Sequence, residues 1–165
     1  MQPAAAALDR PPRDQVPSVV SLGRTCLAIA CGWLCPGLGH VVLGRTRRGI
    51  LFGVLILGSF AMGMAHDGRL ALRDDRQPFL SLLQVVANAG VGPLDAWARI
   101  HVYGDLAYAL PADLGDARRD LRLRVLRQRT QSVLSIYGTA YLWTAGLMNL
   151  LLLFDIWDVG TGKKD

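Results

Sequence analysis

The chain has 165 residues, of which 52% are hydrophobic and 19% are charged, with 18 basic against 13 acidic side chains. The charges gather in short clusters between long uncharged runs, a pattern that is typical of multi-pass membrane proteins and argues against a soluble globular domain. The net charge of +5 then favours anionic membrane lipids over nucleic acid as partners.

Two uncharged runs lie in the N-terminal half of the chain. Residues 1–17 precede them, are rich in alanine, proline and charge, and are expected to form a flexible tail. Residues 25–43 approach the roughly 20 residues that a helix needs to cross a bilayer, although Pro36 interrupts them. Residues 49–65 form a second run at the short end of that range. We predict one transmembrane helix for each run.

The C-terminal half holds a weaker run and a stronger one. Residues 79–98 include polar side chains such as Asp95, so an interfacial helix is an alternative to the transmembrane helix that we favour. Residues 133–154 hold no charge and form the clearest span. The sequence therefore predicts an all-α integral membrane helical bundle over residues 18–158, with about four transmembrane helices, followed by a tail over 159–165.

A basic connection separates these last two runs. Residues 99–132 carry seven Arg against four Asp, and residues 116–131 within them indicate a basic helix that Pro111 and Asp113 introduce. Because no aromatic side chain lies among its arginines, we predict contact with lipid headgroups and no nucleic-acid binding. The predicted apolar stripe of this helix comprises Leu114, Ala117, Leu121 and Val125. The candidate headgroup contacts are Arg118, Arg119, Arg122, Arg124, Arg127 and Arg129.

The arginines also predict which loops share a side of the membrane. The loop over 45–48 holds three Arg and no acidic residue, and the 99–132 connection is similarly rich in Arg. Arginine-rich loops favour the cytoplasm, so we place both loops there. Because two predicted spans separate them, the two assignments agree, and residues 66–78 are expected outside together with both termini.

Two motifs resemble a known family. The first is Pro36-Gly37-Leu38-Gly39-His40 followed by Leu43-Gly44-Arg45, and the second is Ala145-Gly146-Leu147-Met148-Asn149-Leu150-Leu151 followed by Asp155. The first is similar to the helix-loop-helix signature of the two-transmembrane-helix (TM-two) domain. Together they resemble an uncharacterised family of small bacterial multi-pass membrane proteins. The resemblance implies a topology and a bacterial inner-membrane location, and it supplies no catalytic residue.

The proline and two glycines of the first motif interrupt a helix inside an apolar run. Backbone groups that are freed there need partners, so the break must be covered by protein or line a pocket. We favour a packed helix end; the alternative is a pocket in which His40 binds a lipid headgroup or a small ligand. The candidate structural motif comprises Pro36, Gly37, Gly39, His40, Gly44 and Arg45.

Four further polar residues lie inside or at the end of predicted spans. Asn88 and Asn149 are expected to bond to each other and to stabilise the bundle, with a polar substrate site as the alternative. Asp155 and Asp158 share a helix face at the end of the last span. We expect them to be solvated interfacial carboxylates, with a cation site or proton acceptor as the alternative.

No catalytic or cofactor motif is visible in the sequence. A metal site formed by Cys31, Cys35 and His40 is disfavoured, because the helix break separates the histidine from the cysteines. We therefore predict a non-enzymatic membrane protein without a cofactor, acting as a structural, assembly or lipid-contacting subunit. The alternative is a small transporter or channel with Asn88, Asn149 and His40 in an internal cavity. A membrane-protein partner or a homo-oligomer fits either hypothesis.

Overall fold

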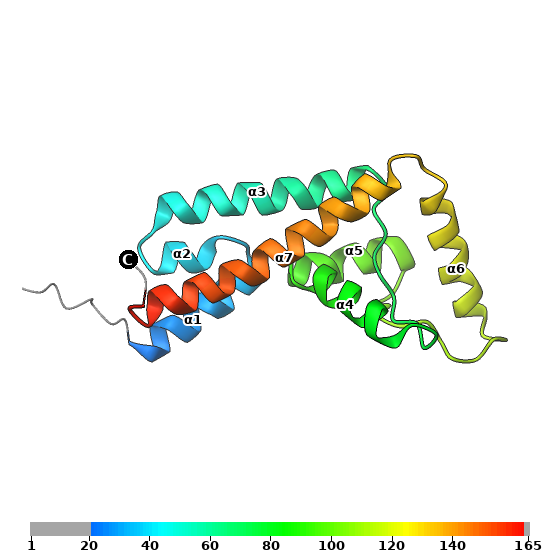
Figure 1. Ribbon diagram of the computed structural model, residues 1–165, viewed down its shortest axis with the longest axis horizontal. Helices are drawn as coiled ribbons and strands as arrows, with labels where there is room; N and C mark the ends of the chain where they lie inside the picture. The colour runs from blue at the N-terminus through cyan, green and yellow to red at the C-terminus, as the bar shows by residue number, and fades with distance from the viewer. Residues whose placement is uncertain (1–20, 164–165) are drawn as a thin grey trace, which may run out of the picture.

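Two long antiparallel helices form the axis of the molecule (Figure 1). The computed structural model describes residues 21–163, and the regular elements within that range are all helices. α3 (Thr46–Ala65) and α7 (Ser135–Gly160) pack along one another. Small and apolar residues recur every three to four positions on the buried face of α3, which is the period of one helix face. These residues are Gly49, Gly53, Ile56, Phe60 and Gly63.

A helical hairpin occupies the region of the predicted span over 25–43. α1 (Leu22–Leu34) ends at a turn, and α2 (Leu38–Val42) returns along α1. The Arg24 guanidinium donates to the Val42 carbonyl oxygen at 2.9 Å, so both ends of the hairpin lie at the same end of the molecule. The prediction of one transmembrane helix is wrong here, because the proline–glycine turn between α1 and α2 reverses the chain.

A second hairpin enters from the opposite end of the molecule. α4 (Pro78–Ala89) and α5 (Pro93–Tyr103) are bent by 110° at the break between them, so the predicted span over 79–98 is not one straight helix. Gly92 has a φ of +73°, which glycine adopts without steric cost. Pro93 then occupies the start of α5, where its missing N–H is not needed. This glycine–proline pair is the sequence signal for the bend.

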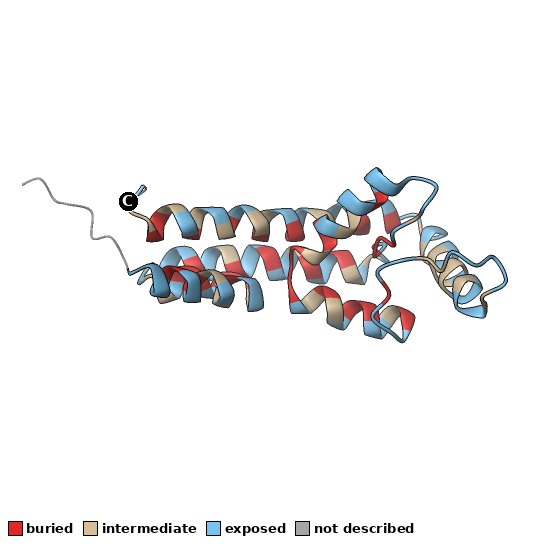
Figure 2. Cartoon of the chain, turned by 90° about the horizontal axis from the view of Figure 1, so that it is seen from below, coloured by how far each residue is buried: buried red, intermediate tan, exposed pale blue. Residues whose placement is uncertain are grey.

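The tips of the two hairpins meet beside the middle of α7. A Cβ built on Gly92 would lie 2.1 Å from the Trp33 carbonyl oxygen, so only glycine fits at this contact. The main core lies between the two long helices and the hairpins and includes Ile56, Leu142 and Ile156. Figure 2 shows buried residues on the facing sides of the helices and exposed residues on their outer sides.

α6 (Ala117–Thr130) stands at the end of the molecule opposite to the 45–48 loop (Figure 1). Its start is fixed by Asp116, whose carboxylate accepts a hydrogen bond from the Arg118 N–H at 2.8 Å. The helix therefore begins within a residue of the predicted start of the 116–131 segment. Asp116 supplies the cap, three residues after the Asp113 start signal.

The two polar loops beside α6 lie together. A backbone bridge joins Arg73 to Ala109, and the Arg129 guanidinium donates to the Gly68 carbonyl oxygen at 3.0 Å. The prediction of which loops share a side of the membrane is wrong. It placed the 99–132 connection on the same side as the 45–48 loop and opposite to the 66–78 loop, but the connection lies beside the 66–78 loop. The physical reason for the difference is the α4–α5 hairpin, because it reverses the chain and brings it back to the end of the molecule where α4 begins.

The last helix is longer than the predicted span over 133–154. It continues to Gly160, where a Cβ would lie 2.4 Å from the Thr25 side chain, so α1 packs against its final turn. The predicted tail over 159–165 consequently begins after Gly160. The predicted tail over 1–17 lies outside the described residues.

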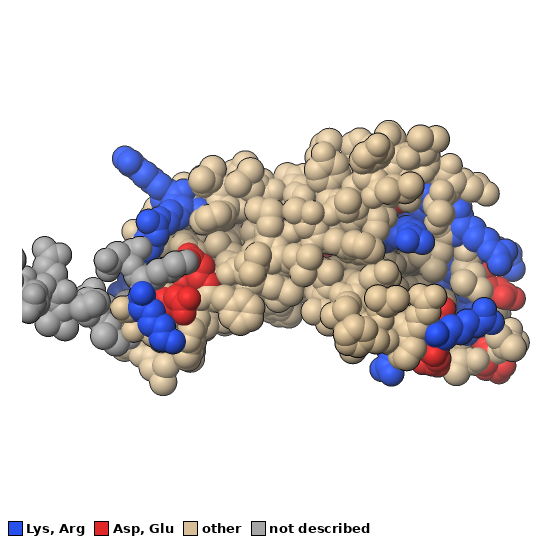
Figure 3. Space-filling view, viewed as in Figure 1, with Lys and Arg blue, Asp and Glu red and all other residues tan. Residues whose placement is uncertain are grey.

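Two helices of the described chain, α3 and α7, are long and apolar enough to cross a membrane, and α4–α5 would be a third if the bent pair is counted as one span. Only 28% of the apolar window of α3 is buried within the chain, and side chains such as Leu51 and Val54 are exposed. In the view of Figure 3, charged side chains gather at both ends of the molecule and leave an uncharged band between them.

Candidate functional site

The first motif forms the turn of the α1–α2 hairpin. Gly37 has a φ of +89°, and a Cβ on it would lie 2.1 Å from the Gly49 carbonyl oxygen of α3. A Cβ on Gly39 would lie 2.4 Å from the Ala28 carbonyl oxygen of α1. Pro36 is buried beside them. These residues allow three helix backbones to approach each other more closely than any side chain permits.

Gly44 and Arg45 make the connection from α2 to α3. Gly44 has a φ of +83° and open space around it, so its conformation, and not close packing, calls for glycine. The Arg45 N–H donates to the His40 carbonyl oxygen at 2.8 Å. The Arg45 Nη1 is buried and has no hydrogen-bond partner within residues 21–163. This segment lies at the same end of the molecule as the last turns of α7 (Figure 1).

The two sequence motifs meet through a hydrogen bond between His40 and Asp155. The His40 Nε2 and the Asp155 Oδ2 are 2.9 Å apart; the histidine is fully buried and the aspartate side chain is 27% exposed. The other ring nitrogen, Nδ1, is buried without a hydrogen-bond partner within residues 21–163, and the ring lies against Phe52. Asp158, one turn along α7, is half-buried. Sequence reasoning singled out both His40 and Asp155 but did not pair them, because 115 positions separate them.

A buried ion pair, which sequence reasoning missed, anchors the second hairpin. The Arg99 Nε donates to the Asp95 Oδ2 at 2.7 Å, and the side chains of these residues are 0% and 1% exposed. The Arg99 Nη1 donates to the carbonyl oxygens of Ala71 and Ala107, and the guanidinium lies 4.2 Å from the centre of the Tyr108 ring. The four-residue spacing of Asp95 and Arg99 on a helix was the available signal. The pair joins α5 to both polar loops.

Burial raises the pKa of the Tyr108 phenol, and the Asp95 carboxylate raises it further, while Arg99 lowers it. The phenol ring therefore stays neutral at physiological pH, as the stacking of a cation on an uncharged aromatic face requires.

The two asparagines do not bond to each other, contrary to the prediction. The Asn88 Oδ1 accepts from the Trp143 indole N–H at 3.1 Å, and the Asn149 Nδ2 donates to the Gly90 carbonyl oxygen at 2.9 Å. Both bonds join the C-terminal end of α4 to α7. Gly90 explains the difference: α4 ends there, which frees a carbonyl that the second amide satisfies.

The six candidate arginines of α6 divide into two groups of three. The Arg119 guanidinium donates to the Pro111 carbonyl oxygen, Arg122 pairs with the Asp105 carboxylate at 2.7 Å, and Arg129 donates to Gly68 as described above. These three are half-buried and hold the loops. The other three are exposed, and their guanidinium groups have no hydrogen-bond or ion-pair partner in the described part of the chain: Arg118, Arg124 and Arg127.

The apolar side of α6 differs from the predicted stripe. Leu121 is 54% exposed and Leu114 is 72% exposed, whereas Leu123 and Leu126 are half-buried. Of the predicted stripe, Val125 is half-buried and packs against the core, whereas Leu114, Ala117 and Leu121 are exposed. Leu123 and Leu126 face a hollow that separates α6 from α4 and α7.

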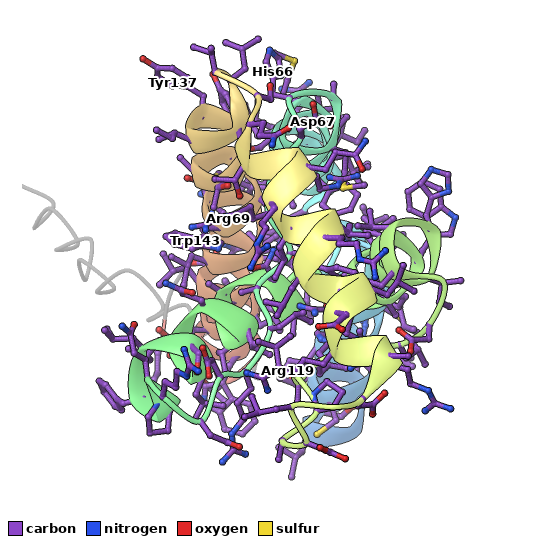
Figure 4. All side chains as sticks on the ribbon, turned by 90° about the vertical axis from the view of Figure 1, so that its right-hand side faces the viewer. His66, Asp67, Arg69, Arg119, Tyr137 and Trp143 are labelled. Atoms are coloured by element: carbon purple, nitrogen blue, oxygen red, sulfur yellow. The ribbon has the colours of Figure 1, made fainter. Side chains whose placement is uncertain are left out.

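This hollow belongs to a groove that contains Arg69, which sequence reasoning did not single out. Three adjoining hollows of about 230, 310 and 420 Å³ each have Arg69 in their lining. Figure 4, seen from the α6 end, shows Arg69 and Trp143 next to each other along α7, and the linings of the three hollows place one common space between α6 and α7. We call this space the Arg69 groove, and its walls include Leu123, Leu126, Thr130, Thr139 and Trp143.

The family comparison agrees with the resemblance seen in the motifs. The model of a family of unknown function, DUF6677, matches residues 27–165. The chain belongs to that family. No curated protein and no solved structure matches the chain.

Within residues 21–163 of this DUF6677 protein, no group of three or more His, Cys or Asp side chains is arranged to hold a metal ion. The hydrogen bonds of the candidate residues join elements that are distant in sequence. His40 joins α2 to α7, Asn88 and Asn149 join α4 to α7, and Arg99 joins α5 to two loops. Among the side chains of residues 21–163 that have no partner and are exposed to an external ligand are three arginines of α6, Arg118, Arg124 and Arg127, and the arginine of the groove, Arg69.

Proposed function

We propose that this protein is a multi-pass membrane protein of structural role, which binds anionic lipids through the basic end that carries α6. In this proposal the long axis of the molecule lies along the membrane normal, α3 and α7 cross the bilayer, and the two hairpins enter it from opposite surfaces. The observation that carries the proposal is the group of unpaired arginines on α6, beside one edge of the uncharged band.

The outward face of the uncharged band supports the membrane part of the proposal. Large apolar side chains of α3 and α7 are exposed along it, including Leu55, Leu147, Leu151 and Phe154. Apolar surface of this extent is unfavourable in water, whereas lipid chains cover it without cost. At the turns of both hairpins, backbone N–H groups donate to carbonyl oxygens within the chain, for example Leu38 to Cys35 and Gly92 to Ala89. Lipid chains could not supply such acceptors.

The arginines support the lipid part of the proposal. Each cation near an anionic leaflet contributes about 1 kcal/mol to attraction, and exposed guanidinium groups retain their full donor capacity. Arg118, Arg124 and Arg127 meet both conditions, while the partnered arginines of α6 maintain its position. Because most arginines of the described chain lie at this end, we orient it toward the cytoplasm.

A labelling experiment tests the orientation. In a chain with Cys26, Cys31 and Cys35 replaced by alanine, single cysteines are placed at Thr46, Asp75 or Gln128. An impermeant thiol reagent applied to intact cells is expected to label the cysteine at position 46 alone, because the other two lie at the α6 end. Labelling at 75 without 128 would contradict the fold, and labelling at all three would contradict a membrane-spanning arrangement.

Reconstitution tests the lipid part. The full chain is placed in vesicles of phosphatidylcholine alone, or of phosphatidylcholine and phosphatidylglycerol in equal parts, and thermal unfolding is followed by circular dichroism. The anionic vesicles should raise the unfolding temperature, and added salt should diminish the rise because it screens exposed charges. The triple variant Arg118→Gln, Arg124→Gln, Arg127→Gln should lose most of it. Equal unfolding temperatures in both vesicles would refute the proposal.

The alternative of a small transporter or channel has less support. It requires Asn88, Asn149 and His40 to line one internal cavity. Each instead bonds to another element of the chain, and the Arg69 groove is lined by other residues. The proposed structural role assigns no catalytic residue and no cofactor.

A further inference from the structure

The Arg69 groove combines a free cation with an apolar channel. The Arg69 backbone N–H donates to the Thr139 Oγ1 at 3.0 Å, which fixes this residue against α7. Its guanidinium makes no hydrogen bond or ion pair within residues 21–163, and the residue is exposed. The backbone of Arg69 is thus anchored, and its unpaired guanidinium can bind an oxyanion through two parallel hydrogen bonds.

The charges around Arg69 favour a negatively charged ligand. Arg127 lines the same groove and is also unpaired within the described chain. The acidic residue in the lining is Asp74, whose carboxylate accepts a hydrogen bond from the Arg76 N–H at 3.1 Å. Two free cations against one engaged carboxylate give the groove a positive potential.

The groove continues from Arg69 along the first turns of α7. This part is lined by Ile136, Ala140 and Trp143, and the ring of Trp143 is held by its bond to Asn88. The hydroxyl groups of Thr130, Ser135 and Thr139 all bond to backbone carbonyl oxygens of the chain, so they do not demand a polar ligand. The surface beyond Arg69 is therefore effectively apolar.

We propose that the Arg69 groove binds one anionic phospholipid, with its phosphate on the Arg69 guanidinium and one acyl chain against Ile136, Ala140 and Trp143. A free phosphate compound would use the cation but not the channel, and a neutral lipid would use the channel but leave the positive potential uncompensated. This inference rests on the proposed membrane function, because the groove must lie at the level of the headgroups. It adds a defined site to the diffuse attraction that α6 exerts.

Native mass spectrometry of the full chain in mild detergent tests the site. Phosphatidylglycerol, phosphatidylcholine and glycerol 3-phosphate are titrated separately. Phosphatidylglycerol should bind in a one-to-one complex at least about tenfold more tightly than either of the others, because the choline cation cancels the negative charge of phosphatidylcholine and glycerol 3-phosphate has no acyl chain for the apolar channel. Equal binding of phosphatidylcholine, or equal binding of glycerol 3-phosphate, would overturn the proposal.

Four variants locate the lipid. Arg69→Gln should weaken phosphatidylglycerol binding about tenfold, while Arg118→Gln, the loss of an exposed unpaired arginine outside the groove, should change it less than about twofold. Ala140→Phe should fill the acyl-chain channel and weaken phosphatidylglycerol binding with Arg69 still present. Arg69→Lys keeps the charge but loses the paired hydrogen bonds of the guanidinium, so it should bind phosphatidylglycerol less tightly than the unmodified chain, and it replaces Arg69→Gln as the test if the glutamine variant folds poorly.

The outcomes separate this site from the general function. If Arg69→Gln binds phosphatidylglycerol like the unmodified chain, or if Arg118→Gln weakens binding as much as Arg69→Gln, the site proposal fails. The proposed function would still be supported if the anionic vesicles raise the unfolding temperature of the unmodified chain and the α6 triple variant loses this rise. If the unmodified chain shows no dependence on lipid charge in either experiment, both proposals fail together.

Discussion

The two hairpins enter the molecule from opposite ends and meet at their tips, but different interactions hold them. In the α1–α2 hairpin the backbones touch at Gly37 and Gly39, and the polar link through His40 reaches a partly exposed carboxylate. In the α4–α5 hairpin both members of an ion pair, Asp95 and Arg99, are buried. The α1–α2 hairpin is therefore stabilised mainly by close backbone packing, whereas the α4–α5 hairpin also depends on a buried ion pair.

This difference shows two ways to accommodate a helix break inside an apolar bundle. Glycine removes the side chain, so a neighbouring backbone covers the break directly. A buried arginine instead bonds to carbonyl oxygens that no helix satisfies, and it needs an acid beside it to balance its charge. The stability of the protein should therefore fall when side-chain volume is added in the α1–α2 hairpin and when one charge is removed from the α4–α5 hairpin.

The largest effect is expected from breaking the buried ion pair. Arg99→Met should lower the free energy of unfolding by about 3–5 kcal/mol, because it leaves the Asp95 carboxylate buried and unpaired. The double variant Asp95→Asn, Arg99→Met should recover part of this loss. Unfolding of the purified chain in mild detergent measures both. A double variant that is less stable than Arg99→Met would contradict the assigned role of the charge.

The second largest effect is expected from volume added in the first hairpin. Gly37→Ala should cost about 2–4 kcal/mol, since alanine is strained at positive φ and its Cβ would clash with the Gly49 carbonyl. Gly58→Ala is the matched control, because its Cβ meets nothing within 4 Å and α3 is helical there. The yield of folded protein and its unfolding temperature should fall for the first variant only. Similar losses in both would remove the steric explanation.

A smaller effect is expected from the polar link of the first hairpin. His40→Phe should cost about 1.5–3 kcal/mol, because it deletes the bond to the Asp155 carboxylate, whereas His40→Gln keeps a donor and should cost less. Detergent unfolding of the two variants, side by side, measures the difference. If glutamine proved as damaging as phenylalanine, the hydrogen bond would not be the stabilising feature.

The smallest effect is expected from the amides of the second hairpin. Asn88→Leu and Trp143→Phe each remove one side of a single bond, and their coupling in a double-mutant cycle should be about 0.6 kcal/mol. The cycle of Asn88→Leu with Asn149→Leu should show less coupling, because these amides have different partners. A larger coupling between the two asparagines would restore the direct bond that the sequence first suggested.

Much of the candidate site was foreseeable residue by residue, but its pairings were not. The sequence pointed to His40, Asp155 and the arginines of α6, because polar groups at the edges of apolar runs are conspicuous. It paired Asn88 with Asn149 because both lie inside apolar runs, although α4 ends beside Asn149 and supplies a backbone acceptor instead. It overlooked Arg69 and Arg99, because each lies in or next to a polar loop where an arginine attracts no notice.

Composition and periodicity by themselves determined that the chain is all-α, where its apolar runs and its basic helix lie, and that 79–98 is the weakest run. These follow from hydrophobicity and from helix caps, which are local properties. Only the tertiary structure decided that two of the four runs are hairpins and which loops share an end. The reason is that proline and glycine weaken a helix at a known residue, but whether the chain then ends, bends or reverses depends on the backbones that pack against the break.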